Sequence, residues 1–141
     1  NVLDNITTSG STYDNTTSSM AGYYINITGG GEKILADPVV FGGVVYFTTY
    51  APPVNKPCEV TGAAQLYGIR YTSGAGVFPG GRSISIGQGI ASSPVVSTGQ
   101  GASTSDIYVT TSSGGVGRVP FNPPGGGRRT NIRFWRDQRL Q

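Results

Sequence analysis

Short stretches of alternating apolar and polar residues, separated by glycine, run through most of the chain and predict short β-strands. The stretch Tyr23–Thr28 (YYINIT) alternates in this way and ends at three glycines, as a half-buried strand does. Val44–Tyr50 (VVYFTTY) is apolar or aromatic on both faces, which predicts an interior strand, and Gly42-Gly43 before it predicts a tight hairpin turn. Further strands are expected at Lys33–Ala36, Pro38–Phe41, Gln65–Thr72, Ser83–Ile86, Pro94–Ser97, Asp106–Ser112, Val116–Phe121 and Thr130–Arg136.

One strand pair recurs in the sequence. The segments Leu35–Tyr50 (LADPVVFGGVVYFTTY) and Ile90–Ser113 (IASSPVVSTGQGASTSDIYVTTSS) both contain Pro-Val-Val, a turn, and a tyrosine between apolar residues before Thr-Thr. The offset between them is 56 residues at Pro38 and 62 at Thr48, so the second turn is longer. A strand pair that returns at this spacing is typical of β-propeller blades. Two unrelated hairpins in a chain rich in valine, tyrosine and threonine would also look alike.

The expected fold is therefore all-β, with antiparallel short strands in two propeller-like blades and an extended N-terminal arm. Propellers close into a ring with roughly four to eight blades. Two blades form an incomplete β-propeller, whose open sheet edges invite pairing with other strands. The chain is thus either part of something larger or a subunit that completes itself with copies of itself.

Composition argues against catalysis. Only 12% of the residues are charged, no histidine is present and there is one cysteine, which removes the commonest general base and any thiolate cluster. Asp37 and Asp106 could serve a hydrolase or lyase, but both stand at strand starts, where turn-forming aspartate is ordinary. We expect no enzyme activity, no catalytic residue, no metal and no cofactor. Because no apolar run is long enough to cross a bilayer, we also expect no membrane insertion.

Residues 1–19 are expected to form a polar arm ahead of a propeller-type domain at 20–141. The arm is rich in asparagine, serine and threonine, and its main apolar residues are Val2, Leu3 and Ile6. Such a segment gains little by packing alone, so we expect it to pair edge-on with a sheet. That sheet belongs either to a neighbouring molecule or to the same chain, and the three apolar residues are the candidates for the contact.

Three N-x-[ST] sequons, at Asn5, Asn15 and Asn26, are candidate glycosylation sites, although so much serine and threonine produces such matches by chance. No leader of basic and then apolar residues is present at the N-terminus. We therefore expect the mature form of a secreted protein, located outside the cell. Cys58 lies in the proline-containing loop Ala51–Gly62 without a partner in the chain, as a free thiol or an intermolecular bridge.

The positive charge is concentrated at the C-terminus. Residues 1–127 carry five basic and six acidic side chains, whereas residues 128–141 carry five arginines and one aspartate. Arginines beside aromatic rings could stack on a nucleic acid, but we expect an outer strand that contacts an acidic protein surface, and no nucleic-acid partner. The candidate contact residues of this tail are Arg128, Arg129, Arg133, Trp135 and Arg136.

Several stretches carry a more specific pattern: GEKILADPVVFGGVVYFTTYAPP, then Pro57-Cys58, QLYGIRYTSG, GQGIASSPVV and, near the end, RRTNIRFWRD. Together they resemble the C-terminal β-propeller of the PilY-type proteins of type IV pilus systems, over residues 22–137 or about four-fifths of the chain. The resemblance implies an extracellular, non-enzymatic protein at the pilus tip, concerned with pilus biogenesis, retraction control or adhesion. The calcium loop of that family has no counterpart, because the sequence contains no D-x-D-x-D run.

Two hypotheses of function follow from these observations. In the first, the chain is a structural subunit of a self-assembling cell-surface filament or pilus-like polymer, and its partners are copies of itself held by β-strand pairing. In the second, it is the adhesin or biogenesis module of a type IV pilus tip, part of a larger PilY-like propeller. Its partners are then pilus components or surface ligands, recognised through the loop Ala51–Gly62.

Overall fold

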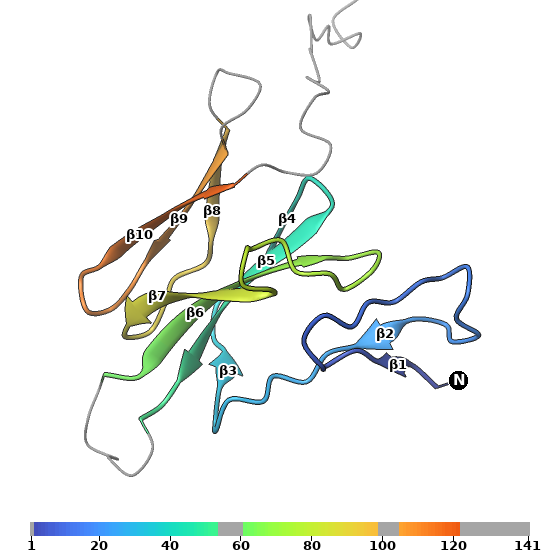
Figure 1. The fold of residues 1–141 in the computed structure, drawn as a ribbon. Helices are drawn as coiled ribbons and strands as arrows, with labels where there is room; N and C mark the ends of the chain where they lie inside the picture. Colours follow the sequence, from blue (N-terminus) through green and yellow to red (C-terminus); the bar gives the residue numbers. More distant parts are fainter. Residues whose placement is uncertain (1, 54–60, 99–104, 122–141) are drawn as a thin grey trace, which may run out of the picture.

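A computed structural model of the chain describes residues 2–53, 61–98 and 105–121. These residues form strands, turns and loops and no helix (Figure 1). The strands make two antiparallel sheets and one short parallel pair, and none of the described sheets closes into a barrel. The expectation of an all-β fold with antiparallel short strands is confirmed.

The larger sheet has five strands and is built around its longest members. Its strands are β3 (Lys33–Ile34), β4 (Val39–Phe41), β5 (Val44–Ala51), β6 (Ala63–Arg70) and β7 (Ser83–Gln88). Strand β6 lies between β5 and β7, while β3 and β4 pair with different halves of the opposite edge of β5. Strand β5 is therefore interior, as its apolar faces predicted.

The turn between β4 and β5 is the tight hairpin that the glycine pair predicted. Phe41 pairs with Val44 across a two-residue loop, and the φ angles of Gly42 and Gly43 are 57° and 81°. Two successive left-handed residues are the requirement of a type I′ turn, which only glycine and a few polar residues meet easily. The turn thereby fixes the register in which β4 and β5 pair.

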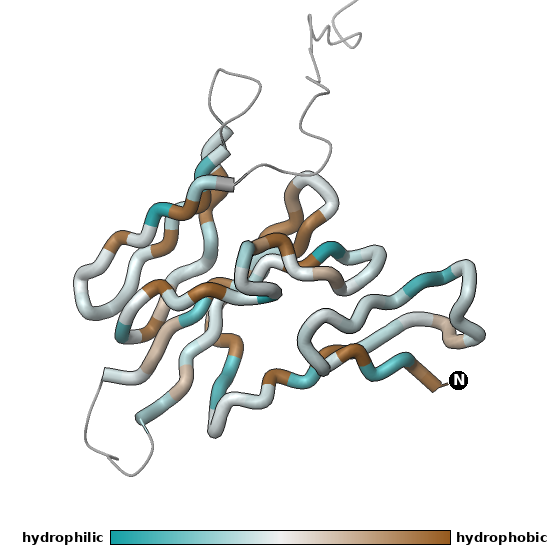
Figure 2. Tube along the Cα trace, viewed as in Figure 1, coloured by the Kyte–Doolittle hydropathy of each residue, from teal (hydrophilic) through white to brown (hydrophobic). Residues whose placement is uncertain are grey.

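The smaller sheet has three strands, β8 (Val95–Thr98), β9 (Ser105–Thr110) and β10 (Val116–Phe121), with β9 in the middle. It lies beside the larger sheet, at the upper left of Figure 1, and the brown stretches of Figure 2 show apolar residues on the strands of both sheets. The buried apolar cluster joins the two sheets. Its members are Val44, Tyr46, Ala64, Leu66, Phe78, Ala91, Ile107 and Val109.

The repeated strand pairs have the same register but bury opposite faces. Val39 pairs with Tyr46 in the first hairpin, and their counterparts Val95 and Tyr108 pair in the second. Tyr46 is completely buried, whereas Tyr108 is exposed and its neighbour Ile107 is buried instead. The first hairpin thus buries the face that carries Tyr46 against the second hairpin. The second hairpin buries the opposite face, which carries Ile107, against the first.

The N-terminal segment forms a strand pair of its own, at the right of Figure 1. Strands β1 (Asp4–Asn5) and β2 (Tyr23–Tyr24) run parallel. The alternating stretch Tyr23–Thr28 was expected to be a strand throughout, but only its first two residues have a ladder partner. The strand predicted at Lys33–Ala36 also stops early, at Ile34. The other described strands end within two residues of the prediction, and Thr130–Arg136 lies outside the described residues.

Candidate functional site

The backbone of the N-terminal arm is tied to its own chain. The Asp4 amide donates a hydrogen bond to the Gly22 carbonyl (2.9 Å), and the Ile6 amide donates to the Tyr24 carbonyl (3.2 Å). Further along, the Asn26 amide donates to the hydroxyl of Thr7 (2.9 Å). Of the two alternatives for the arm, pairing within the same chain is therefore the one found in this single chain.

Ile6 is the apolar residue that anchors the arm. Its side chain is 4% exposed, whereas Val2 and Leu3, ahead of it, are exposed. It lies against Gly74, where a Cβ atom would collide with the Ile6 Cδ1 and would approach the Tyr23 ring to 3.1 Å. The φ angle of Gly74 is 68°, a conformation that a side chain disfavours. Glycine at this position therefore creates the space that receives the arm.

Arg82 connects the arm to the turn ahead of β7. Its Nε donates to the Gly74 carbonyl (2.8 Å), its Nη1 donates to the carbonyls of Thr7 and Thr8 (3.3 Å each), and its Nη2 donates to the Ser11 carbonyl. A guanidinium group offers five N–H donors in a fixed plane and suits such a cluster of carbonyls. Arg82 is thus a positioning residue for the arm.

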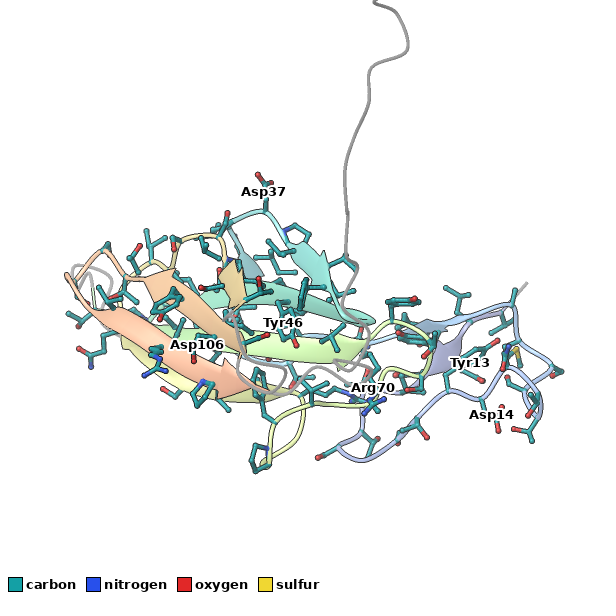
Figure 3. All side chains as sticks on the ribbon, turned by 90° about the horizontal axis from the view of Figure 1, so that it is seen from above. Tyr13, Asp14, Asp37, Tyr46, Arg70 and Asp106 are labelled. Carbon is teal, nitrogen blue, oxygen red and sulfur yellow. The ribbon has the colours of Figure 1, made fainter. Side chains whose placement is uncertain are left out.

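Two tyrosines complete the attachment. The Tyr23 hydroxyl lies within hydrogen-bonding distance of the carbonyls of Arg70 (3.1 Å) and Tyr71 (2.8 Å), which share its one proton. Burial raises the pKa of Tyr23. The ring of Tyr13 lies 5.5 Å from the Tyr23 ring, and the Tyr13 amide donates to the Ser73 carbonyl (2.8 Å). Figure 3 shows Tyr13 and Asp14 on the arm, to the side of the sheets.

A hollow of about 470 Å³ lies between the arm and the segment that leads into β7. Hydroxyl groups of the arm, among them Thr7 and Ser11, line one side, and the rings of Tyr67 and Phe78 line the other. Arg82 is the only charged residue in this lining, and its donors bind backbone carbonyls. The hollow therefore offers neutral hydrogen-bonding groups and apolar rings, without an acid–base pair.

The carboxylate of Glu32 is hydrogen-bonded to two strands of the larger sheet. Its Oε1 accepts hydrogen bonds from the Thr49 hydroxyl and from the Tyr67 hydroxyl (3.2 Å). Burial, and then the negative charge of Glu32, raise the pKa of Tyr67, whose ring stacks on Phe47 at 4.9 Å between centroids. No cation accompanies this carboxylate in the hydrogen bonds described, and the group holds β3 against β5 and β6.

The two aspartates considered for catalysis do not form a pair. Asp37 points outward from the loop between β3 and β4, away from Asp106 (Figure 3). Asp106 forms an ion pair with Arg118 on the neighbouring strand (3.1 Å), which raises the pKa of that arginine. No cluster of three or more histidine, cysteine, aspartate or glutamate side chains that could hold a metal exists in the described parts of the chain.

Both sheets expose apolar side chains on the faces that point away from the shared core. Strands β8, β9 and β10 expose Val95, Tyr108 and Val116, while Ile34 and Val40 are exposed on the larger sheet. These residues were not singled out from the sequence. The repeat could have drawn attention to Tyr108, because Tyr108 is the counterpart of Tyr46, which belongs to the core.

The remaining predicted site residues are distributed as follows. Asn5, Asn15 and Asn26 are all exposed, and the Asn5 side chain accepts a hydrogen bond from the Thr7 amide (3.1 Å). Cys58 and most of the loop around it lie outside the described residues. The same holds for the tail contacts predicted from the sequence, Arg128, Arg129, Arg133, Trp135 and Arg136.

Within the described residues, no helix is long and apolar enough to span a membrane. Comparison with known proteins adds no relative: no family model, no curated protein and no solved structure matches the chain.

Proposed function

We propose that the chain is a non-enzymatic, extracellular structural subunit that assembles with copies of itself into a surface filament, held by β-strand pairing between subunits. The proposal rests on the unpaired strand edges of the two sheets. Within the described residues, β7 and β10 each pair with a neighbour on one side only. Unpaired strand edges are templates for another strand, and the scarcity of acid–base groups favours a structural role.

The stacking of the sheets supports a propeller-like arrangement. In a propeller, each blade turns one face to the next blade and the opposite face to the previous one, because a rotation relates the blades. The two hairpins follow this rule, since equivalent strands bury opposite faces. Two blades do not close a ring, so further copies or further chain must cover the outer faces.

The arm supplies a connector for such an assembly. Its strand pairing with β2 is two residues long, and Val2 and Leu3 are exposed ahead of it. If the arm of one copy occupied the space beside Gly74 in another copy, Ile6 would make the same contacts between two molecules that it makes within one. Exchange of an identical element between copies is a low-cost route to association.

The test is negative-stain microscopy with sedimentation of the purified chain and two variants. Ile6→Ser removes the anchor of the arm, and Leu35→Ser, which alters an exposed residue outside the arm, is the matched control. We expect filaments from the parent chain and the control, and small particles from Ile6→Ser. Filaments that persist in Ile6→Ser would exclude the arm as connector, and a parent chain that remains a single small particle would exclude the function.

A second candidate is the pilus-tip module, favoured by the same repeat. If the chain is the closing part of a larger propeller, the missing blades come from the same polypeptide. An upstream coding sequence with more Pro-Val-Val hairpins, and a monomer when those blades are included, would support this candidate over the filament.

A further inference from the structure

The outer face of the smaller sheet presents a continuous apolar patch. Val95, Tyr108 and Val116 are 61%, 36% and 69% exposed. Val95 pairs directly with Tyr108, and Val116 pairs with Thr110, two residues further along the same face of β9. The three side chains therefore share one face of the sheet, with Val95 directly beside Tyr108 and Val116 diagonal to it, next to Arg118, which pairs with Tyr108.

Each residue of this patch has a counterpart on the inner face of the larger sheet, where two of the three counterparts belong to the buried core. The repeat equates Val95 with Val39 and Tyr108 with Tyr46. It also equates Val116 with Leu66, because Thr110 pairs with Val116 as Thr48 pairs with Leu66. Tyr46 and Leu66 are completely buried, in the same cluster as Ile107 and Val109 of the smaller sheet.

Those core residues are covered by the inner face of the smaller sheet. The counterpart of this inner face is the outer face of the larger sheet. By the same register, Val40 corresponds to Val96, which packs on the core, and Phe47 corresponds to Val109. Val40 is 63% exposed, and Phe47 is half-buried beside Tyr67. The hollow between the arm and the segment that leads into β7 opens onto this face at Tyr67, and Val40 is not among its lining residues.

We propose that the outer face of the larger sheet of a second copy docks on the Val95–Tyr108–Val116 patch, so that copies stack head to tail. This deepens, and rests on, the proposed self-assembly by naming the surfaces in contact. It continues the interface that already joins the two sheets within one chain.

Such a contact is heterologous, because two different faces meet. Heterologous contacts produce a ring when the rotation closes and a filament when it does not. With two sheets in each chain, a ring of four to eight blades needs about two to four copies. Either product leaves each inner copy with both outer faces covered.

The test uses two charged substitutions on the full chain, one for each face, and sedimentation at increasing protein concentration. Tyr108→Glu blocks the patch, Val40→Glu blocks the receiving face, and Ile90→Glu, at an exposed loop residue, is the control. Each blocking variant should weaken self-association by about 30-fold or more, as loss of a central contact does. The thermal unfolding midpoint of both variants should stay near that of the parent, because both side chains are exposed.

Mixing gives the decisive result. Tyr108→Glu retains an intact receiving face and Val40→Glu retains an intact patch, so an equimolar mixture should form a one-to-one dimer and associate more tightly than either variant alone. Association that survives both substitutions would overturn the stacking contact and leave the proposed self-assembly standing. A parent chain that does not associate at any concentration would overturn both.

Discussion

Gly74 shows how the absence of a side chain positions a whole segment. At this residue two requirements coincide, because the backbone is left-handed and Ile6 occupies the space of a Cβ atom. Gly10 has a similar φ angle of 84°, but a Cβ atom there would meet nothing within 4 Å. A comparison of substitutions at these two glycines therefore distinguishes the effect of backbone strain from the effect of a steric clash.

We expect Gly74→Ala to destabilise the chain more than Gly10→Ala. Both substitutions carry about 1–2 kcal/mol of left-handed strain, and Gly74→Ala adds about 1–3 kcal/mol of overpacking against Ile6. Urea unfolding measures the difference, and the exchange rate of the Ile6 amide shows whether the arm has moved. Equal losses of stability in the two variants would mean that Ile6 does not occupy this site.

Tyr46 gives the core a dependence on high pH. Burial raises its pKa to about 12, above the value near 10 of an unfolded tyrosine. The folded chain therefore holds this proton more tightly than the unfolded chain does. The stabilisation is complete below pH 10 and is lost as the pH rises towards 12, by an amount on the order of 2–3 kcal/mol.

Unfolding free energies measured between pH 9 and pH 12 test this expectation. Tyr46→Phe, which keeps the ring and removes the titrating group, should flatten the fall with pH. Tyr23 and Tyr67, whose pKa values are also raised, leave a smaller slope in that variant. A Tyr46→Phe chain with the same slope as the parent would rule out Tyr46 as the group responsible.

At the scale of elements, one guanidinium, that of Arg82, donates to three carbonyls of the arm. We expect Arg82→Ala to loosen the arm, because four hydrogen bonds from a charged group to carbonyls are lost, three of them to carbonyls of the arm. Such bonds contribute about 1.5–3 kcal/mol each when measured singly. Hydrogen exchange of the Asp4, Ile6 and Tyr13 amides should speed up, while the amides of β9 keep their protection. Arg118→Ala, which removes an exposed cation, is the control and should leave the arm in place.

The elements also show how far the sequence leads. Alternation, turn glycines and the repeat predicted most strands, because those signals are local. They failed at Tyr23–Thr28, since a strand needs a ladder partner and β1 supplies only two residues. Arg82 could not be found in advance, because its acceptors are backbone carbonyls, which leave no trace in the sequence. Along β9, alternation marks the face of Ile107 and Val109 as apolar, whereas the repeat equates Tyr108 with the buried Tyr46, so the two signals disagree on which face points inward.

At the scale of the whole molecule, the two sheets share a single core and should unfold together. Ile107→Ala leaves a cavity between them and should cost about 2–5 kcal/mol. Because Ile107 lies in one cluster with Tyr46 and Leu66, amides of β5 and β6 should lose protection along with those of β9. Ile90→Ala, at an exposed residue, should change stability by no more than about 0.5 kcal/mol.

Loss of protection confined to β8, β9 and β10 in Ile107→Ala would show that the sheets are separate folding units. A single cooperative transition in both denaturant and heat would support the shared core. The comparison needs only the exchange pattern, so it is independent of whether copies associate.

The reversal of faces between the two hairpins bears on how a gene of this kind can lengthen. A tandem duplication that adds another hairpin unit needs no newly evolved contact, because the added unit already matches the face of its predecessor. Loss of a unit is tolerated for the same reason. Natural variants should therefore differ in size by whole multiples of some 56–62 residues, the spacing within this chain, and seldom by a single strand.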